Sequence, residues 1–406
     1  MSKTRVVIVD DSALVRRLLS DILNSDPQIE VVACAKDAFA ARKEIKEKKP
    51  HVITLDVEMP KMDGITFLRN LMRLHPMPVI MISTLTEKGA NVTMQALEYG
   101  AIDFIPKPKI DISHSIEHYA EEIIDKVKQA RYAKVQCFEN TKSKLISTSA
   151  STSTSLTSAP KTSLEVSPED DDKRFVIEQE HSVDEVLPID NHQHVNYQTT
   201  EQIVAIGAST GGTEAVRSVI EELPANFPGI VVTQHIPSAF SAAFAKRMNA
   251  SSAMVVNEAK DGQQIMRGHV YVAPGGQHLL VVRDGAIFRC KLSNDMPVNR
   301  HRPSVDVLFR SVAQSLGQNT LGIILTGMGK DGAVGIKEIQ EAGAYTIAQD
   351  EASSVVWGMP GEAVKLGGIN KILPLNLIAK HMQELNVKRE SEVASMPSQT
   401  SLSMSQ

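Results

Sequence analysis

The chain is predicted to form two α/β domains, each built on a doubly wound parallel sheet, joined by a disordered linker. Its 406 residues exceed the roughly 100 to 200 residues of one typical domain. Short β-branched runs alternate with amphipathic helix patterns in two blocks, which is typical of parallel sheets covered by helices. The stretch between the blocks has few apolar residues to bury. The expected bounds are 1–134 and 201–386 for the domains, 135–200 for the flexible linker and 387–406 for a disordered tail.

The first block contains five candidate strands and at least two amphipathic helices. The strands are expected at residues 5–9, 30–35, 51–55, 78–83 and 102–105. After a candidate N-cap at Ser12, apolar side chains recur every three or four residues from Leu14 to Ile22, and again from Ile65 to Met72. This spacing predicts surface helices that each bury one stripe.

The second block repeats the alternation of strands and helices. Its strands are expected at residues 203–206, 230–233, 270–273, 321–325 and 345–348. Residues 255–300 differ from this pattern and are predicted to be rich in hairpins.

The region between the blocks has the composition of a linker. Residues 141–163 contain 14 Ser or Thr in 23 positions, which is typical of flexible segments. The segment from Glu165 to Asp190 contains ten acidic residues and only two basic ones, Lys173 and Arg174. Its formal net charge is therefore about −8. The net charge of −5 therefore comes from the linker.

Composition excludes several classes of protein. Residues 201–386 carry 16 basic and 16 acidic side chains, without the positive excess expected of a nucleic-acid-binding domain. No apolar run is long enough to span a membrane, and Val6–Val9 is too short for a signal peptide. The three cysteines lie far apart and suit neither a disulfide framework nor a zinc site. We expect a cytoplasmic protein with no direct membrane insertion and no nucleic-acid partner.

Charged side chains of the first block follow its strands at the points where they end. Asp10 and Asp11 follow the first strand, Asp56 the third and Lys107 the fifth. These strand ends converge in an open parallel sheet. Carboxylates pressed together repel one another unless a divalent cation such as Mg²⁺ neutralises them. The pattern predicts a Mg²⁺ site in which Asp56 attacks a phosphoryl group opposite Lys107.

A simpler interpretation is that these aspartates only cap a helix or end a strand, since Asp favours both places. The functional interpretation is favoured because the lysine, and two hydroxyls after the fourth strand (Ser83 and Thr84), fall at the same edge.

The segments VIVDDS, LDVEMPKMDG, MISTLT and IPKP resemble the response-regulator receiver family over residues 3 to 130. The resemblance implies a flavodoxin-like fold, phosphorylation of Asp56 by a histidine kinase, and a switch formed by Ser83 with Lys107. Thr84 remains an alternative to Ser83. The Mg²⁺ ligands that it implies are Asp10, Asp11, Asp56 and the carbonyl of Glu58.

The second block has a candidate nucleophile at its first strand end. The strand at 203–206 runs into Gly207-Ala208-Ser209-Thr210-Gly211, followed by a helical pattern near Thr213. The G-x-S-x-G spacing allows a sharp turn from which the serine hydroxyl projects near a helix N-terminus. His235 and Asp331 follow two further strands, so the same edge offers a general base and a carboxylate to orient it.

The proposed roles are attack by Ser209, proton transfer by His235 and orientation of the imidazole by Asp331. The chain order Ser, His, Asp differs from that of α/β-hydrolases, so the triad is expected to be convergent. The backbone N–H groups of Met328 and Gly329 are candidate oxyanion donors, one such donor being worth about 3 kcal/mol.

Other interpretations of these residues stay open at this point. A glycine-rich strand-to-helix turn also binds phosphates, although no Walker lysine follows Gly212. His278 and His301 compete with His235, since a lone histidine is usually structural. Asp331 could instead be an N-cap, with Asp350 as its rival.

A second resemblance covers most of residues 201–386. The segments GASTGG, TQHIP, VYVAPGGQHL, HRPSVDVLF, ILTGMGKDGAVG and AQDEASSVVWGMPGEA are similar to the chemotaxis protein-glutamate methylesterase family. The resemblance implies a Rossmann-like catalytic domain whose triad is Ser209, His235 and Asp331, with no cofactor for ester hydrolysis. It also implies glutamine deamidation and, as substrates, the cytoplasmic helices of methyl-accepting chemotaxis receptors.

The order of the two domains implies control of the esterase by phosphorylation. The receiver is expected to cover the Ser209 edge until phosphorylation of Asp56 weakens the docked interface. The alternatives are a phosphorylation-controlled receptor-binding module without catalysis, a transcription regulator and a general lipase-like esterase.

Overall fold

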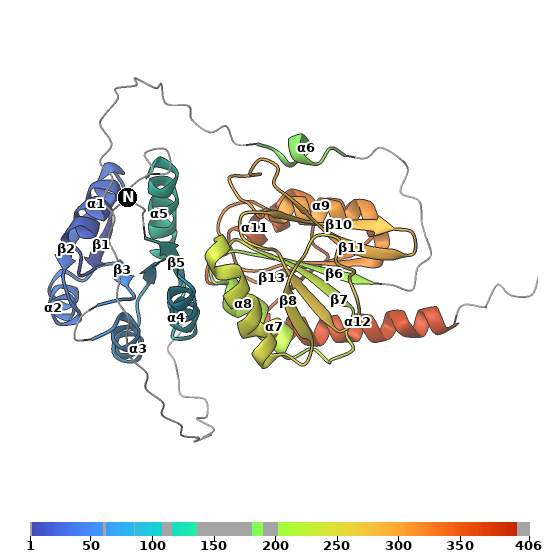
Figure 1. The fold of residues 1–406 in the computed structure, drawn as a ribbon, viewed down its shortest axis with the longest axis horizontal. Helices are drawn as coiled ribbons and strands as arrows, with labels where there is room; N and C mark the ends of the chain where they lie inside the picture. Colours follow the sequence, from blue (N-terminus) through green and yellow to red (C-terminus); the bar gives the residue numbers. More distant parts are fainter. Residues whose placement is uncertain are drawn as a thin grey trace, which may run out of the picture.

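The computed structural model describes residues 2–59, 62–84, 86–107, 116–135, 181–189 and 202–395. Two α/β domains lie side by side, and α4, β5 and α5 of the first face the second (Figure 1). In the described residues no helix is both long and apolar enough to cross a bilayer.

The first domain is a five-stranded parallel sheet in the order β2-β1-β3-β4-β5, which is the flavodoxin-like order. Its strands are β1 (Thr4–Val9), β2 (Ile29–Ala35), β3 (Val52–Asp56), β4 (Val79–Ser83) and β5 (Asp103–Pro106). Its helices are α1 (Ala13–Ser25), α2 (Ala38–Lys48), α3 (Gly64–Leu74), α4 (Glu87–Glu98) and α5 (Ile116–Ala130). The predicted parallel α/β class is confirmed.

Successive side chains of a strand point to opposite faces of the sheet, so the core of this domain forms two layers, one on each face. Val6 and Ile8 of β1 pack with residues of α1 and α5, whereas Val7 and Val9 pack on the side of α2, α3 and α4. Both faces of a parallel strand are therefore buried, as doubly wound sheets require. The Ser12 hydroxyl accepts from the Val15 N–H and caps α1 as predicted.

The second domain is a seven-stranded parallel sheet in the order β14-β13-β12-β6-β7-β9-β8. Its strands are β6 (Ile203–Ala208), β7 (Gly229–Gln234), β8 (Val255–Glu258), β9 (His269–Val272), β12 (Thr320–Ile324), β13 (Tyr345–Gln349) and β14 (Lys371–Leu373). Its helices are α7 (Gly212–Glu221), α8 (Ser238–Ser251), α9 (Val305–Leu316), α10 (Ala333–Glu341), α11 (Met359–Lys365) and α12 (Leu375–Ser395).

The structure corrects the prediction for residues 255–300. Only β10 (His278–Asp284) and β11 (Ile287–Ser293) form an antiparallel hairpin, while β8 and β9 pair in parallel and extend the main sheet. The edge strands β8 and β14 are short, so their apolar runs were too brief to predict from sequence alone.

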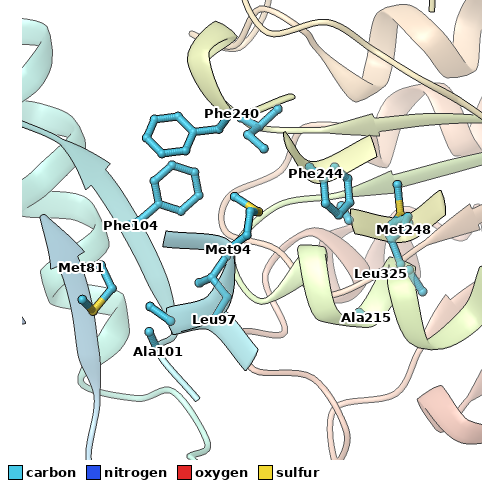
Figure 2. Close-up of a cluster of buried hydrophobic side chains, with 14 of the residues drawn as sticks. Met81, Met94, Leu97, Ala101, Phe104, Ala215, Phe240, Phe244, Met248 and Leu325 are labelled. Atoms are coloured by element: carbon cyan, nitrogen blue, oxygen red, sulfur yellow. The ribbon is translucent and has the colours of Figure 1, made fainter. Parts of the chain in front are cut away.

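An apolar cluster joins the two domains. The rings of Phe104 on β5 and Phe240 on α8 have centroids 4.5 Å apart. Figure 2 shows Phe104 and Met94 of the first domain facing Phe240 and Phe244 of the second, and all four side chains are buried. At the edge of the cluster, Arg247 pairs with Glu98 of the first domain and Glu214 of its own.

The disordered tail predicted from residue 387 is wrong up to Ser395, because α12 continues to that residue. Ile378, Ala379 and Met382 hold the first half of the helix in the core. Further along, Arg389 donates to the Asn319 side chain and Glu390 pairs with Arg267. Residues 396–406 lie outside the described residues.

The prediction of a flexible linker throughout 135–200 is also wrong for residues 181–189. They contain the helical turn α6 (Val183–Val186), which packs beside α9 (Figure 1). The Ser/Thr-rich stretch, with the remainder of 136–180 and 190–200, lies outside the described residues.

Candidate functional site

Ser209, His235 and Asp331 meet at the carboxyl edge of the second sheet. The His235 Nδ1 atom lies 3.1 Å from the Ser209 hydroxyl, and its Nε2 atom lies 2.8 Å from Asp331 Oδ2. The two contacts use opposite sides of the imidazole ring, so one side faces the nucleophile and the other the carboxylate. This is the relation that proton transfer from serine to histidine requires.

Small residues shape the turn that carries Ser209. Gly211 has a positive φ of 75°, and at Gly212 an added Cβ would lie 2.2 Å from the Gln234 side chain. The Ser209 N–H donates to the Thr326 carbonyl, and the Gln234 amide donates to the Ser209 carbonyl. Neighbouring strand ends therefore hold the backbone of the serine, while its hydroxyl is left to His235.

Asp331 is almost fully buried, with 1% of its surface exposed. Besides His235, its carboxylate accepts from Asn299 Nδ2 (2.8 Å), the Ser304 hydroxyl (2.8 Å) and the Val305 N–H (2.6 Å). Burial alone would raise the pKa of Asp331, but the hydrogen bond and charge of His235 outweigh it and hold the pKa below its usual value. Asp331 is therefore an ionised group that can orient an imidazole.

A second buried carboxylate lies next to Asp331. Asp306 accepts from the Gly335 N–H and from Asn299 Nδ2, which bridges the two aspartates. Burial and the negative charge of Asp331 raise the pKa of Asp306. No local sequence pattern marks Asp306, because it lies inside α9.

Of the three competing residues, His278 and Asp350 have partners outside the triad, whereas His301 contacts His235. His278 is buried between the Met296 carbonyl and the Ser304 N–H. Asp350 binds the backbone and hydroxyl of Ser353. His301 does enter the site, because its ring stacks on His235 with centroids 3.7 Å apart.

Met328 and Gly329 line the same cleft as Ser209 and His235. Within the described part of the chain, neither backbone N–H has a hydrogen-bond partner. Gly329 has a φ of 79°, a left-handed conformation that favours glycine.

The cleft has a volume of about 1110 Å³ and is lined by both domains. Residues of the α5 region of the first domain, including Glu121 and Lys126, line it together with Ser209 and His235. Next to the nucleophile, the Thr210 hydroxyl donates to Asp103 of β5 at 2.6 Å. Lys126 holds the other oxygen of Asp103 at 3.3 Å. Sequence reasoning missed this contact, since nothing local marks a pair 107 positions apart.

The acidic residues of the first domain also gather as expected. Ligand oxygens of Asp10, Asp11 and Asp56 lie within 4.8 Å of one another. Lys107 Nζ lies 2.8 Å from Asp56 Oδ2 and 3.4 Å from Asp10 Oδ2. Burial is the largest effect on Asp56 and raises its pKa to about 6, although Lys107 opposes it. Burial likewise raises the pKa of Asp10.

This cluster fits a divalent cation. Asp10 Oδ2 and Asp56 Oδ2 are buried, and among the described residues their one polar partner is the ammonium group of Lys107, which the two oxygens share. Hard carboxylate oxygens left in this way are the ligands that Mg²⁺ prefers. The Glu58 N–H donates to Asp56 Oδ1, which places Glu58 beside the cluster.

The two candidate switch hydroxyls differ in their surroundings. Ser83 is fully buried at the end of β4 and accepts from the Thr93 hydroxyl at 2.7 Å. Thr84 is partly exposed and contacts the Thr86 hydroxyl. The Lys107 N–H donates to the Ser83 carbonyl, so Ser83 is the hydroxyl residue linked to the lysine through the backbone.

Comparison with known proteins identifies a family for each sheet. Residues 6–117 match the response regulator receiver domain family, and residues 204–382 match the family described as CheB methylesterase.

Curated relatives match nearly the whole chain. A protein-glutamate methylesterase/protein-glutamine glutaminase 1 of Xanthomonas campestris pv. campestris is 51% identical, over 95% of this chain and 98% of its own. One from Hahella chejuensis is 52% identical, over 92% and 94%. Among solved structures, the CheB methylesterase catalytic domain of Thermotoga maritima is 37% identical and covers 46% of this chain and 100% of its own, with a TM-score of 0.45.

Proposed function

Because this chain belongs to the protein-glutamate methylesterase/protein-glutamine glutaminase family, we propose that it hydrolyses glutamate methyl esters on chemotaxis receptors under control of its receiver domain. Glutamine deamidation is its second reaction. The observation that carries the proposal is the Ser209–His235–Asp331 chain of contacts in a cleft that both domains line.

The ester reaction proceeds through an acyl-enzyme. Ser209 attacks the ester carbonyl carbon while His235 Nδ1 takes the hydroxyl proton. The tetrahedral intermediate then collapses, His235 returns the proton to the leaving oxygen, and methanol departs. Water, deprotonated by His235, attacks the glutamyl-serine ester and regenerates Ser209 and a free glutamate. For glutamine the leaving group is ammonia.

The imidazole of His235 uses its nitrogens in the reverse order of serine proteases, with Nδ1 toward serine and Nε2 toward aspartate. Either ring nitrogen can accept a proton, so the chemistry is preserved. Asp331 then fixes the tautomer by accepting from Nε2–H. The N–H groups of Met328 and Gly329 are the proposed donors to the oxyanion.

In the receiver, Asp56 accepts a phosphoryl group from a chemotaxis histidine kinase. Asp10, Asp11, Asp56 and the Glu58 carbonyl are the proposed ligands of Mg²⁺, which when bound neutralises charge on the transferred phosphoryl group. Lys107 supplies a further positive charge 2.8 Å from Asp56. Ser83 is the proposed switch hydroxyl, and its move toward the phosphoryl group would break its contact with Thr93.

The domain contacts support autoinhibition. Receiver residues line the cleft that contains Ser209, and Asp103 accepts a hydrogen bond from Thr210, the residue next to the nucleophile. A phosphoryl group on Asp56 adds negative charge at the sheet edge where β4 and β5 end. This change weakens the contacts that α4, β5 and α5 make with the second domain. We expect these reactions in the cytoplasm, where the receptor helices lie.

The test is methanol release from methylated receptor membranes by the wild type, Ser209→Ala and Asp56→Asn, each with and without a small phosphoryl donor and Mg²⁺. We expect stimulation of the wild type, no release by Ser209→Ala, and an unchanged basal rate for Asp56→Asn. If the wild type releases no methanol while still binding receptors, it is a binding module without catalysis.

A further inference from the structure

Residues 181–189, within the acidic linker, dock on the catalytic domain; we call them the anchor. Val183 of α6 is 5% exposed and packs in a small apolar cluster with Leu280, Val298 and Val307. Apolar burial of this kind is what separates a docked segment from a flexible one.

A buried arginine holds the anchor from the other side. Arg310 of α9 is only 2% exposed and donates to Asp184 Oδ1 and to the Leu187 carbonyl. It also pairs with Glu338 of α10. Close to it, the Gln314 amide donates to the Pro188 carbonyl at 2.9 Å. The anchor thus satisfies donors on two turns of α9.

The anchor also binds the turn formed by residues 298–301. The Asn299 N–H donates to the His181 carbonyl at 3.1 Å, and His181 forms a β-bridge with Val298. The turn is closed by two backbone hydrogen bonds between Val298 and His301. His181 therefore holds the outer side of the turn, where Asn299 adopts a positive φ of 50°.

The same turn contacts two members of the proposed triad. The Asn299 amide donates to Asp331 Oδ1 and to Asp306 Oδ2, both at 2.8 Å. The His301 ring stacks on His235. One turn therefore determines where the carboxylate and the imidazole can lie relative to each other.

We infer that Asn299 is a positioning residue for Asp331 and that the anchor keeps Asn299 in place, so that residues 181–189 of the linker are an accessory part of the active centre. The inference rests on the proposed function, because it concerns the geometry of the same triad. Its physical basis is the sensitivity of proton transfer to placement, since a displacement of about 1 Å can lower a rate by about 100-fold.

The first variant is Asn299→Gly in the full chain, assayed with the phosphoryl donor and Mg²⁺. Glycine accepts the positive φ at this position and removes only the amide. We expect kcat for methanol release to fall by about 10- to 100-fold with KM within about twofold. Asn294→Gly, which removes an exposed amide from the same loop, is the matched control and is expected to keep the wild-type kcat.

The second variant, Val183→Ser with Asp184→Asn, releases the anchor while Arg310 keeps its pair with Glu338. Hydrogen exchange at the Asn299 N–H reports release, because that group donates to His181. We expect faster exchange and a kcat lowered by at least about fivefold. Asp284→Asn, at an exposed Asp–Arg pair of the β10–β11 hairpin, is the control for the charge change.

Combining the two variants separates positioning from general stabilisation. If the anchor acts through Asn299, Asn299→Gly lowers kcat less in the anchor variant than in the wild type. Additive losses, or a wild-type kcat with a released anchor, overturn the inference while leaving the proposed function intact. Should Asn299→Gly not fold, the anchor variant decides alone. A wild type that releases no methanol overturns both proposals.

Discussion

The two domains each place a buried aspartate at the carboxyl edge of a parallel sheet, but they compensate its charge differently. Asp331 accepts hydrogen bonds from His235, Asn299, Ser304 and the Val305 N–H. Asp56 accepts a hydrogen bond from the Glu58 N–H and forms an ion pair with Lys107, whose ammonium group also pairs with Asp10.

The difference appears in the pKa values of the two groups. Hydrogen bonding and the charge of His235 hold the pKa of Asp331 below its usual range despite burial. Burial raises the pKa of Asp56 to about 6. The same position in the fold therefore holds a carboxylate whose ionised form is stabilised, at Asp331, or a carboxylate whose negative charge is only partly compensated, at Asp56. A bound cation would stabilise the second. The hydrogen-bond donors and the neighbouring charges around each carboxylate together decide between them.

The largest expected effect is on Asp331. Asp331→Asn should lower kcat for methanol release by about 10⁴-fold, because an amide at this position no longer fixes the tautomer of His235. Initial-rate kinetics with methylated receptor membranes measure this. The isosteric change at the exposed Asp284 serves as the control, and a loss below about tenfold for Asp331→Asn would refute the proposed role.

A second prediction concerns the pH dependence of receiver stability. The pKa of Asp56 is about 6, against an ordinary 3.8, so the folded state binds a proton more tightly than the unfolded state. The contribution of Asp56 to the free energy of unfolding is fully present below about pH 4 and is lost as the pH rises through about 6. The free energy of unfolding should fall by at most about 3 kcal/mol over this range. Urea denaturation without Mg²⁺ measures the slope.

Asp56→Asn should flatten that slope, because the substituted side chain does not titrate. Asp21→Asn, at a side chain that is 73% exposed, should keep the wild-type slope. An equal slope in the wild type and Asp56→Asn would show that folding does not raise the pKa of Asp56, and the contrast between the domains would fail.

The third prediction sharpens the same contrast with a cation. Mg²⁺ at about ten times its dissociation constant should stabilise the receiver of the wild type by about 1.4 kcal/mol through preferential binding to the folded state. Asp56→Asn should lose most of this gain, and Asp331→Asn should retain it. Thermal unfolding with and without Mg²⁺ makes the comparison, and equal gains in all three proteins would contradict it.

The smallest expected effect is at the interface that couples the two sites. Phe104→Ala removes the ring that packs on Phe240 and should raise basal methanol release about three- to tenfold, because the receiver covers the cleft less often. The stimulation by phosphoryl donor should shrink in proportion. Ala substitution at Phe39, an exposed aromatic of the same domain, is the control, and an unchanged basal rate for Phe104→Ala would argue against autoinhibition.

The sequence by itself determined the α/β class and the edge at which each site lies. Strands of β-branched residues followed directly by Asp10, Asp56, Ser209 or His235 carry this information locally, because parallel strands end on one side of a sheet. Local sequence and strand direction suffice to bring Asp10 and Asp56 to one edge of the first sheet, and Ser209 and His235 to one edge of the second.

Only the tertiary structure decided which groups surround them. Asn299 reaches Asp331 across 32 positions, and Arg310 reaches Asp184 across 126, so neither contact leaves a local pattern. The same holds for α12, whose last turns are held by Asn319 and Arg267 rather than by an apolar stripe. Local propensity reports what a segment can form, whereas distant partners determine whether a polar segment stays ordered and whether a buried carboxylate stays charged.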